Sequence, residues 1–246
     1  DTASAALARF DLIAPPPRGH GPAMTRIPFD VVGFDLDGTL IDSSADLAAG
    51  VNHALTSIGL PSHSVEEVKG FVGKGVKIML ERALRASGDY SEARLDALRP
   101  IFADYYAAHL TVHSRPYPGA VAALETLAAR GTRVALCTNK SEQFTLPLLD
   151  QLGLTGHFSA IVCGDTLGPG VLKPDPAPVR AMVERAGGGR AVFIGDTSHD
   201  VEAAHAAGLA SIAVRFGFVD AADQLGADAI LDGYPHLVPL LERWPG

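Results

Sequence analysis

The stretch FDVVGFDLDGTL, residues 29–40, decides the fold. Its first half is a short apolar run at residues 29–34, and two aspartates and a glycine follow directly. Strands buried in a parallel sheet have this pattern, because helices cover both of their faces. We therefore predict a buried parallel strand at residues 29–34, with Asp35 and Asp37 at its carboxyl end.

Beyond residue 116 the sequence alternates between short apolar runs and longer runs in which apolar residues have helical spacing. Strict alternation of strands and helices predicts an α/β fold, a doubly wound parallel sheet with helices on both faces. The expected strands lie at residues 133–137, 160–163, 191–194 and 211–214, and the expected helices at 120–130, 142–152, 177–186 and 199–207.

The segment between residues 43 and 115 contains helical patterns only. About 70 residues are too many for an ordinary loop, so we predict an all-helical cap inserted after the first strand. Its helices are expected at residues 45–58, 76–86 and 92–110, with an interruption at Pro100. The expected division is a poorly ordered leader at residues 1–26, an α/β core at 27–42 and 116–246, and a helical cap domain at 43–115.

The 246 residues carry 20 Lys and Arg against 28 Asp and Glu, a net charge of −8. An acidic chain without dense basic runs repels nucleic acids and anionic membranes, so we expect neither as a partner. No apolar run approaches the ~18 residues of a membrane span, and no secretory signal is evident. Cys137 and Cys163 follow apolar runs and lack a CxxC pattern, which favours buried free thiols and a cytoplasmic protein.

Acidic residues follow two of the predicted strands. Asp35 and Asp37 follow the first, and GDTSHD at residues 195–200 places Asp196 and Asp200 after a later one. The carboxyl ends of parallel strands meet at one edge of a sheet, where ligands of such folds bind. Converging carboxylates repel one another unless a cation lies between them, and oxygen ligands of this kind suit Mg²⁺. We therefore expect a magnesium site at this edge.

Carboxylates alone would repel a phosphate group, but two other segments supply groups that attract it. Thr138 and Asn139 follow the strand at 133–137 and offer hydroxyl and amide donors. Lys173 precedes the helix at 177–186 and offers a cation. The combination favours a small phosphorylated metabolite as the ligand.

These residues resemble the four motifs of the haloacid dehalogenase superfamily of phosphohydrolases. The matching segments are FDLDGTL at residues 34–40, Thr138 within LCTNK, Lys173 within LKPDP, and IGDTSHD at residues 194–200. The helical insertion resembles the cap of the first class in this family. Both CTNK and GFVGKG at residues 70–75 are similar to its phosphoglycolate phosphatase branch.

The resemblance implies an enzyme in which Asp35 attacks phosphorus and Asp37 acts first as an acid and then as a base. It implies Mg²⁺ held by Asp35, by the backbone carbonyl of Asp37 and by Asp196. Asp200 is then a further metal ligand, or it orients Lys173 or the water shell of the metal, or it caps the following helix. The implied phosphate site consists of Thr138, Asn139 and Lys173, and the implied substrate contacts of the cap are Gly73, Lys74 and Gly75.

The resemblance implies hydrolysis of a phosphate ester, because the dehalogenase branch of the family lacks the second aspartate that Asp37 supplies here. Similarity to the phosphoglycolate phosphatase branch makes 2-phosphoglycolate the expected substrate. The same chemistry on N-acetylmuramic acid 6-phosphate, pyrophosphate or a hexose phosphate stays open, since cap residues set that choice. A non-catalytic phospho-receiver or binding module on the same sheet is the alternative from a different class. A homodimer is also left open, because the sequence does not decide the oligomeric state.

Overall fold

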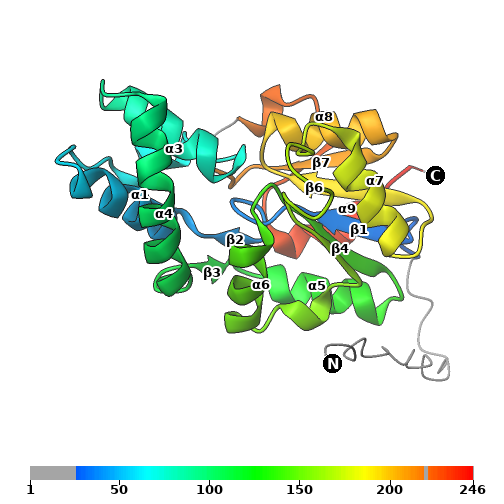
Figure 1. The fold of residues 1–246 in the computed structure, drawn as a ribbon. Helices are drawn as coiled ribbons and strands as arrows, with labels where there is room; N and C mark the ends of the chain where they lie inside the picture. The colour runs from blue at the N-terminus through cyan, green and yellow to red at the C-terminus, as the bar shows by residue number, and fades with distance from the viewer. Residues whose placement is uncertain (1–25, 219–220, 246) are drawn as a thin grey trace, which may run out of the picture.

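A six-stranded parallel sheet lies at the centre of the computed structural model, which describes residues 26–218 and 221–245 (Figure 1). The strand order is β5-β4-β1-β6-β7-β8, and every neighbouring pair is parallel. This confirms the predicted doubly wound parallel sheet. The leader expected at residues 1–26 lies outside the described residues except for Arg26. The strands are β1 (Val31–Phe34), β4 (Arg133–Cys137), β5 (Ala160–Val162), β6 (Ala191–Gly195), β7 (Ala210–Val214) and β8 (Ala229–Leu231).

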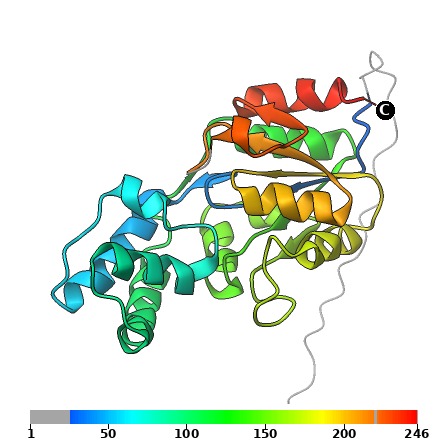
Figure 2. The same ribbon diagram turned by 90° about the horizontal axis from the view of Figure 1, so that it is seen from above.

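Helices cover both faces of the sheet (Figures 1 and 2). On one face lie α5 (Ala120–Ala129) and α9 (Leu237–Glu242), and on the other lie α7 (Pro176–Arg185) and α8 (Ser198–Ala207). Because both faces are covered, all four residues of β1 are buried, as its continuous apolar pattern predicts. The remaining core elements are α6 (Glu142–Gln151) and the 3-10 turns Thr155–His157, Ala222–Gln224 and Tyr234–His236.

Helix α7 packs very close to the central strand β1. A Cβ atom at Gly33 of β1 would lie 2.4 Å from Met182 Cε and 2.9 Å from Phe193 Cδ2. Glycine therefore lets the helix pack directly on the backbone of β1. The register of β1 places Phe34 beside Leu136 of β4 and beside Ile194 of β6, so the chain that leaves β1 lies between the ends of two other strands.

Four helices between two short strands stand at the carboxyl edge of the sheet (Figure 1). The strands β2 (Ile41–Asp42) and β3 (Arg115–Pro116) pair antiparallel and connect this helical unit to the core. Within the unit, α1 packs mainly against α4. The helices are α1 (Ser44–Ser57), α2 (Val65–Lys69), α3 (Gly75–Ala86) and α4 (Glu92–Ala108).

The interruption predicted at Pro100 is wrong, because α4 continues through this residue. Leu98, Phe102 and Tyr106 are fully buried on both sides of the proline, and the rings of Phe102 and Tyr106 stack at 5.2 Å. Proline in a helix interior costs about 3 kcal/mol. Burial of several large side chains along one face of the helix outweighs that cost.

Replacing Pro100 with alanine is therefore expected to stabilise the protein by about 1–3 kcal/mol. Pro100 is exposed, so the substitution restores a backbone donor without leaving a cavity. Urea unfolding of Pro100→Ala should give a higher midpoint than the wild type. Pro61→Ala, in the exposed loop before α2, is the matched control with little expected change. A lower midpoint for Pro100→Ala would contradict this account of α4.

Several short elements were not predicted from the sequence. The strand β8 has three residues, α2 has five and α9 has six, and none is long enough to show a clear period. The strands β2 and β3 have two residues each. None of the described helices is both long and apolar enough to cross a membrane.

Candidate active site

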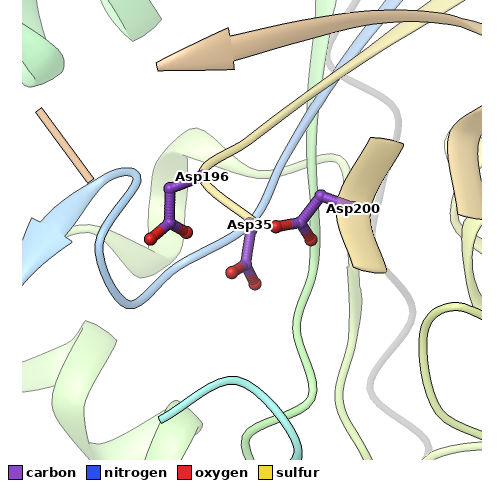
Figure 3. A group of neighbouring side chains, drawn as sticks. All are labelled: Asp35, Asp196 and Asp200. Atoms are coloured by element: carbon purple, nitrogen blue, oxygen red, sulfur yellow. The ribbon is translucent and has the colours of Figure 1, made fainter. Parts of the chain in front are cut away.

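Three buried aspartates converge at the carboxyl edge of the sheet (Figure 3). Asp35 follows β1, Asp196 follows β6, and Asp200 lies in the first turn of α8. One carboxylate oxygen of each aspartate lies within 4.8 Å of the others. The adjacent positions of β1 and β6 in the sheet thus bring together three of the residues predicted for the metal site.

The turn after β1 fits closely around Asp196. Gly38 has a φ of +81°, and a Cβ atom there would lie 2.4 Å from Asp196 Oδ2. Both the left-handed backbone and this contact require glycine. The Thr39 hydroxyl donates to Asp196 Oδ1 at 3.1 Å, and the Phe218 N–H donates to Oδ2 at 2.9 Å. These hydrogen bonds orient the Asp196 carboxylate.

The Lys173 ammonium group lies among the aspartates. Its Nζ atom is 2.8 Å from Asp35 Oδ1 and 2.6 Å from Asp200 Oδ1, and it donates to the Cys137 carbonyl at 2.8 Å. The Thr197 hydroxyl and N–H donate to the other Asp200 oxygen at 2.7 and 3.0 Å. Asp200 thus contacts Lys173 and caps the start of α8, which are two of the roles predicted for it, and metal ligation by Asp200 stays a prediction.

Burial and crowding change the protonation of this cluster. Burial raises the pKa of Asp35 to about 6, while the Lys173 ammonium lowers it and the Asp200 charge raises it. Burial, followed by the charges of Asp200 and Asp35, raises the pKa of Asp196 well above its usual value. A divalent cation among these oxygens would favour their ionised forms. A buried set of carboxylate oxygens is the donor set that Mg²⁺ prefers, so the three aspartates fit the predicted ion.

Asp37 contacts a second buried lysine, which sequence reasoning did not select. Lys140 Nζ donates to both carboxylate oxygens of Asp37, at 3.1 and 3.0 Å, and to the Tyr106 hydroxyl of α4 at 2.7 Å. The Ser43 hydroxyl donates to Asp37 Oδ1 at 2.5 Å. Burial alone would lower the pKa of Lys140, but the contacts with Asp37 and Tyr106 raise it by more. The net pKa lies above its usual value, so the ammonium group stays charged. Burial raises the pKa of Tyr106 to about 12, so its hydroxyl keeps its hydrogen.

Thr138 and Asn139 follow β4 and line the same cavity as the aspartates. The buried Thr138 hydroxyl accepts a hydrogen bond from the Lys140 N–H at 3.2 Å. Asn139 Nδ2 donates to the carbonyls of Gly73 and Lys173 at 2.9 and 3.0 Å, and Oδ1 accepts from the Lys173 N–H at 2.9 Å. Asn139 therefore connects the loop before α3 and the loop that contains Lys173 to the core. Its predicted contact with phosphate stays a prediction.

The three predicted cap residues differ in position. Gly73 and Gly75 line the cavity, and their φ angles of +116° and +77° give the sharp turn that begins α3. Lys74 between them is exposed and does not line the cavity but an adjoining groove, which shares Gly75 and Val76 with it. The substrate contact expected for Lys74 stays a prediction.

A partly open cavity lies over the aspartates between the core and the helical unit, and its volume is about 50 Å³. Most of its charged residues are buried, and water screens interactions between buried charges only weakly. Its charged lining residues are Asp35, Asp37, Asp196, Asp200, Lys140 and Lys173. Its apolar lining residues are Leu47, Val72, Val76, Met79, Phe144 and Phe218.

The sequence model of the haloacid dehalogenase-like hydrolases matches residues 32–214, which include all of these charged residues. The chain belongs to the haloacid dehalogenase-like hydrolase family. This hydrolase is 40% identical over 213 residues to a phosphoglycolate phosphatase of Agrobacterium fabrum, covering 85% of this chain and 90% of the relative. It is also 40% identical over 199 residues to phosphoglycolate phosphatase 1 of Pseudomonas aeruginosa, covering 79% and 72%.

A solved structure supports the same assignment. The crystal structure of a protein from Haemophilus somnus, described as a predicted phosphoglycolate phosphatase, matches this hydrolase with a TM-score of 0.81 and 32% sequence identity. The match covers 87% of this chain and 98% of that one. The resemblance to the superfamily is thus confirmed, and this hydrolase is a phosphatase of the family.

Proposed function

We propose that this phosphatase hydrolyses 2-phosphoglycolate to glycolate and phosphate, with Mg²⁺, through an aspartyl phosphate on Asp35. The observation that carries the proposal is the convergence of three buried carboxylates and Lys173 at one point beside Asp37. Names of relatives at 40% identity support the choice of substrate. A phospho-receiver would need neither Asp37 nor a helical unit over the site.

The first half of the proposed reaction forms the aspartyl phosphate. An Asp35 oxygen attacks phosphorus, and the bond between phosphorus and the glycolate oxygen breaks. Lys173, held by Asp200, neutralises negative charge beside the attacking carboxylate. Asp35, the Asp37 carbonyl and Asp196 would hold Mg²⁺, which supplies further positive charge to the transferring phosphoryl oxygens.

Asp37 moves the protons in both halves of the reaction. It donates a proton to the leaving glycolate oxygen in the first half. It then takes a proton from a water molecule, whose oxygen attacks phosphorus and releases phosphate from Asp35. The proton that Asp37 gives up in the first half is thus replaced in the second. Hydrogen bonds from Ser43 and Lys140 hold the Asp37 carboxylate in the cavity.

A substrate panel tests the proposed specificity. The names of the relatives support 2-phosphoglycolate as the substrate. We therefore expect kcat/KM for 2-phosphoglycolate to exceed that for glucose 6-phosphate, pyrophosphate and N-acetylmuramic acid 6-phosphate by roughly tenfold or more. A preference of this size for any of the other three compounds would reassign the substrate and leave the proposed chemistry in place.

Mg²⁺ is expected to stabilise the fold more at pH 8 than at pH 5. Because the folded-state pKa of Asp35 is about 6, above the usual 3.8, the metal-free fold loses stability as pH rises through about 6. At pH 5 protons compete with the ion for these carboxylates. Mg²⁺ at a hundred times its Kd should stabilise by about 3 kcal/mol.

Thermal unfolding with and without Mg²⁺ at the two pH values measures this effect. Asp196→Asn is the control variant, and it should show a much smaller Mg²⁺-dependent rise in Tm at pH 8. An equal rise at both pH values, or an unchanged rise in Asp196→Asn, would contradict metal binding at this site.

We keep the cytoplasm as the proposed location, because both described cysteines are free and buried, which suits a reducing compartment.

A further inference from the structure

The proposed substrate has a second charged end that the catalytic groups do not bind. In 2-phosphoglycolate the carboxylate is one methylene away from the ester oxygen. A group that binds it must lie beside the residue that protonates that oxygen, which is Asp37 in the proposed function on which this inference rests. Two cations line the cavity within the described chain, and Lys173 contacts Asp35 and Asp200 on the phosphate side. Lys140 contacts Asp37.

We propose that the Lys140 ammonium group, together with the Tyr106 hydroxyl, binds the carboxylate of the substrate and selects small phosphate esters with a second negative charge. Both residues line the cavity, and Lys140 Nζ lies 2.7 Å from the Tyr106 oxygen. The pair therefore forms one polar patch beside Asp37.

Both groups can donate to a substrate carboxylate. The three hydrogens of the Lys140 ammonium group face both Asp37 oxygens and the Tyr106 hydroxyl, so a substrate oxygen would take over one of the two contacts with Asp37. The Tyr106 hydroxyl accepts a hydrogen bond from Lys140, so its own hydrogen can be donated to a substrate oxygen. A carboxylate bound here would receive one charged and one neutral hydrogen bond, and charge-assisted bonds are the stronger kind.

The other residues that line this part of the cavity explain why Lys140 decides specificity. The cap contributes the apolar side chains Leu47, Val76 and Met79 to the cavity. Such a surface accepts an uncharged ester tail but penalises a desolvated carboxylate that lacks a partner. The Lys140 side chain is itself only 5% exposed, so its interaction with a substrate carboxylate is weakly screened by water. Lys74, the cap cation expected from the sequence, is exposed and does not line this cavity.

The test compares two esters that differ only at the proposed binding position. Ethyl phosphate has the chain of 2-phosphoglycolate with a methyl group in place of the carboxylate. The readout is the ratio of kcat/KM for 2-phosphoglycolate to kcat/KM for ethyl phosphate, at saturating Mg²⁺. This ratio does not depend on the fraction of folded enzyme, so partial unfolding of a variant does not alter it.

We expect Lys140→Met to lower this ratio roughly 10- to 100-fold, because the variant loses a hydrogen bond to a charged group. Lys140→Arg, which keeps the charge, should have a ratio closer to the wild type than to Lys140→Met. Lys77→Met is the matched control: this exposed lysine pairs with Glu92 in the cap, and its ratio should equal that of the wild type.

The outcomes separate this inference from the proposed function. If the wild type prefers 2-phosphoglycolate and Lys140→Met loses activity on both esters equally, Lys140 acts only through Asp37 and the inference is overturned. The same holds if Lys140→Arg loses the preference as fully as Lys140→Met does. If the wild type itself does not distinguish the two esters, the proposed substrate is wrong, and the carboxylate site is rejected with it.

Discussion

Asp35→Asn is expected to lower kcat by roughly 10⁴-fold or more, because an amide cannot form the aspartyl phosphate. The substitution changes little in shape, and Lys173 keeps its contact with Asp200. The raised pKa of Asp35 means that its ionised form is unfavourable in the metal-free fold. We therefore expect the metal-free variant to unfold at the same Tm as the wild type, or a higher one, at pH 8.

Initial rates on 2-phosphoglycolate and thermal unfolding measure the two effects on the same preparation. Asp104→Asn, at an exposed position of α4, is the control and should retain wild-type kcat. Most of the rate remaining in Asp35→Asn would show that another group attacks phosphorus. A large fall in Tm would instead show that Asp35 is needed for the fold.

Asp37→Asn is expected to lower kcat on 2-phosphoglycolate by roughly 10²- to 10⁴-fold, because an alkoxide leaves slowly without a proton. The same variant should behave differently with p-nitrophenyl phosphate, whose leaving group needs no proton. Its first half-reaction should stay fast, while the second is slow because water lacks its base. The variant should then release a burst of p-nitrophenol and turn over slowly afterwards.

Stopped-flow absorbance measures the burst, whose size should match the concentration of enzyme. The wild type should show a steady release without a burst of this kind if its second half-reaction is not limiting. Equal slowing of both esters in Asp37→Asn, with no burst, would contradict the role of Asp37 as the acid. It would indicate that the residue acts on the attack by Asp35 instead.

The acidic part of the site could be predicted because it depends on strand ends. Asp35 and Asp196 each directly follow a buried apolar run, and adjacency of parallel strands then brings them together. Lys173 could be predicted as a nearby cation for the same reason. Its contacts with Asp35 and Asp200 follow from loop geometry that no local pattern records.

The substrate side of the site could not be predicted, because it depends on how the helical unit packs on the core. Lys140 follows two residues that were selected at a strand end, and that position was the available signal for it. Tyr106 is a buried aromatic residue on one face of α4, and its sequence neighbourhood resembles any helix core. Lys74, which lies between two glycines, was predicted to contact the substrate, but its side chain is exposed.

Trapping the phosphorylated enzyme tests the central claim most directly. Asp37→Asn mixed with p-nitrophenyl phosphate should accumulate the phosphoenzyme, and acid quenching within the burst should preserve it. Borohydride reduces an acyl phosphate to an alcohol, so mass spectrometry of the digested protein should find homoserine at position 35. A phosphoryl group on a different residue, or none during a full burst, would contradict the claim that Asp35 is the nucleophile.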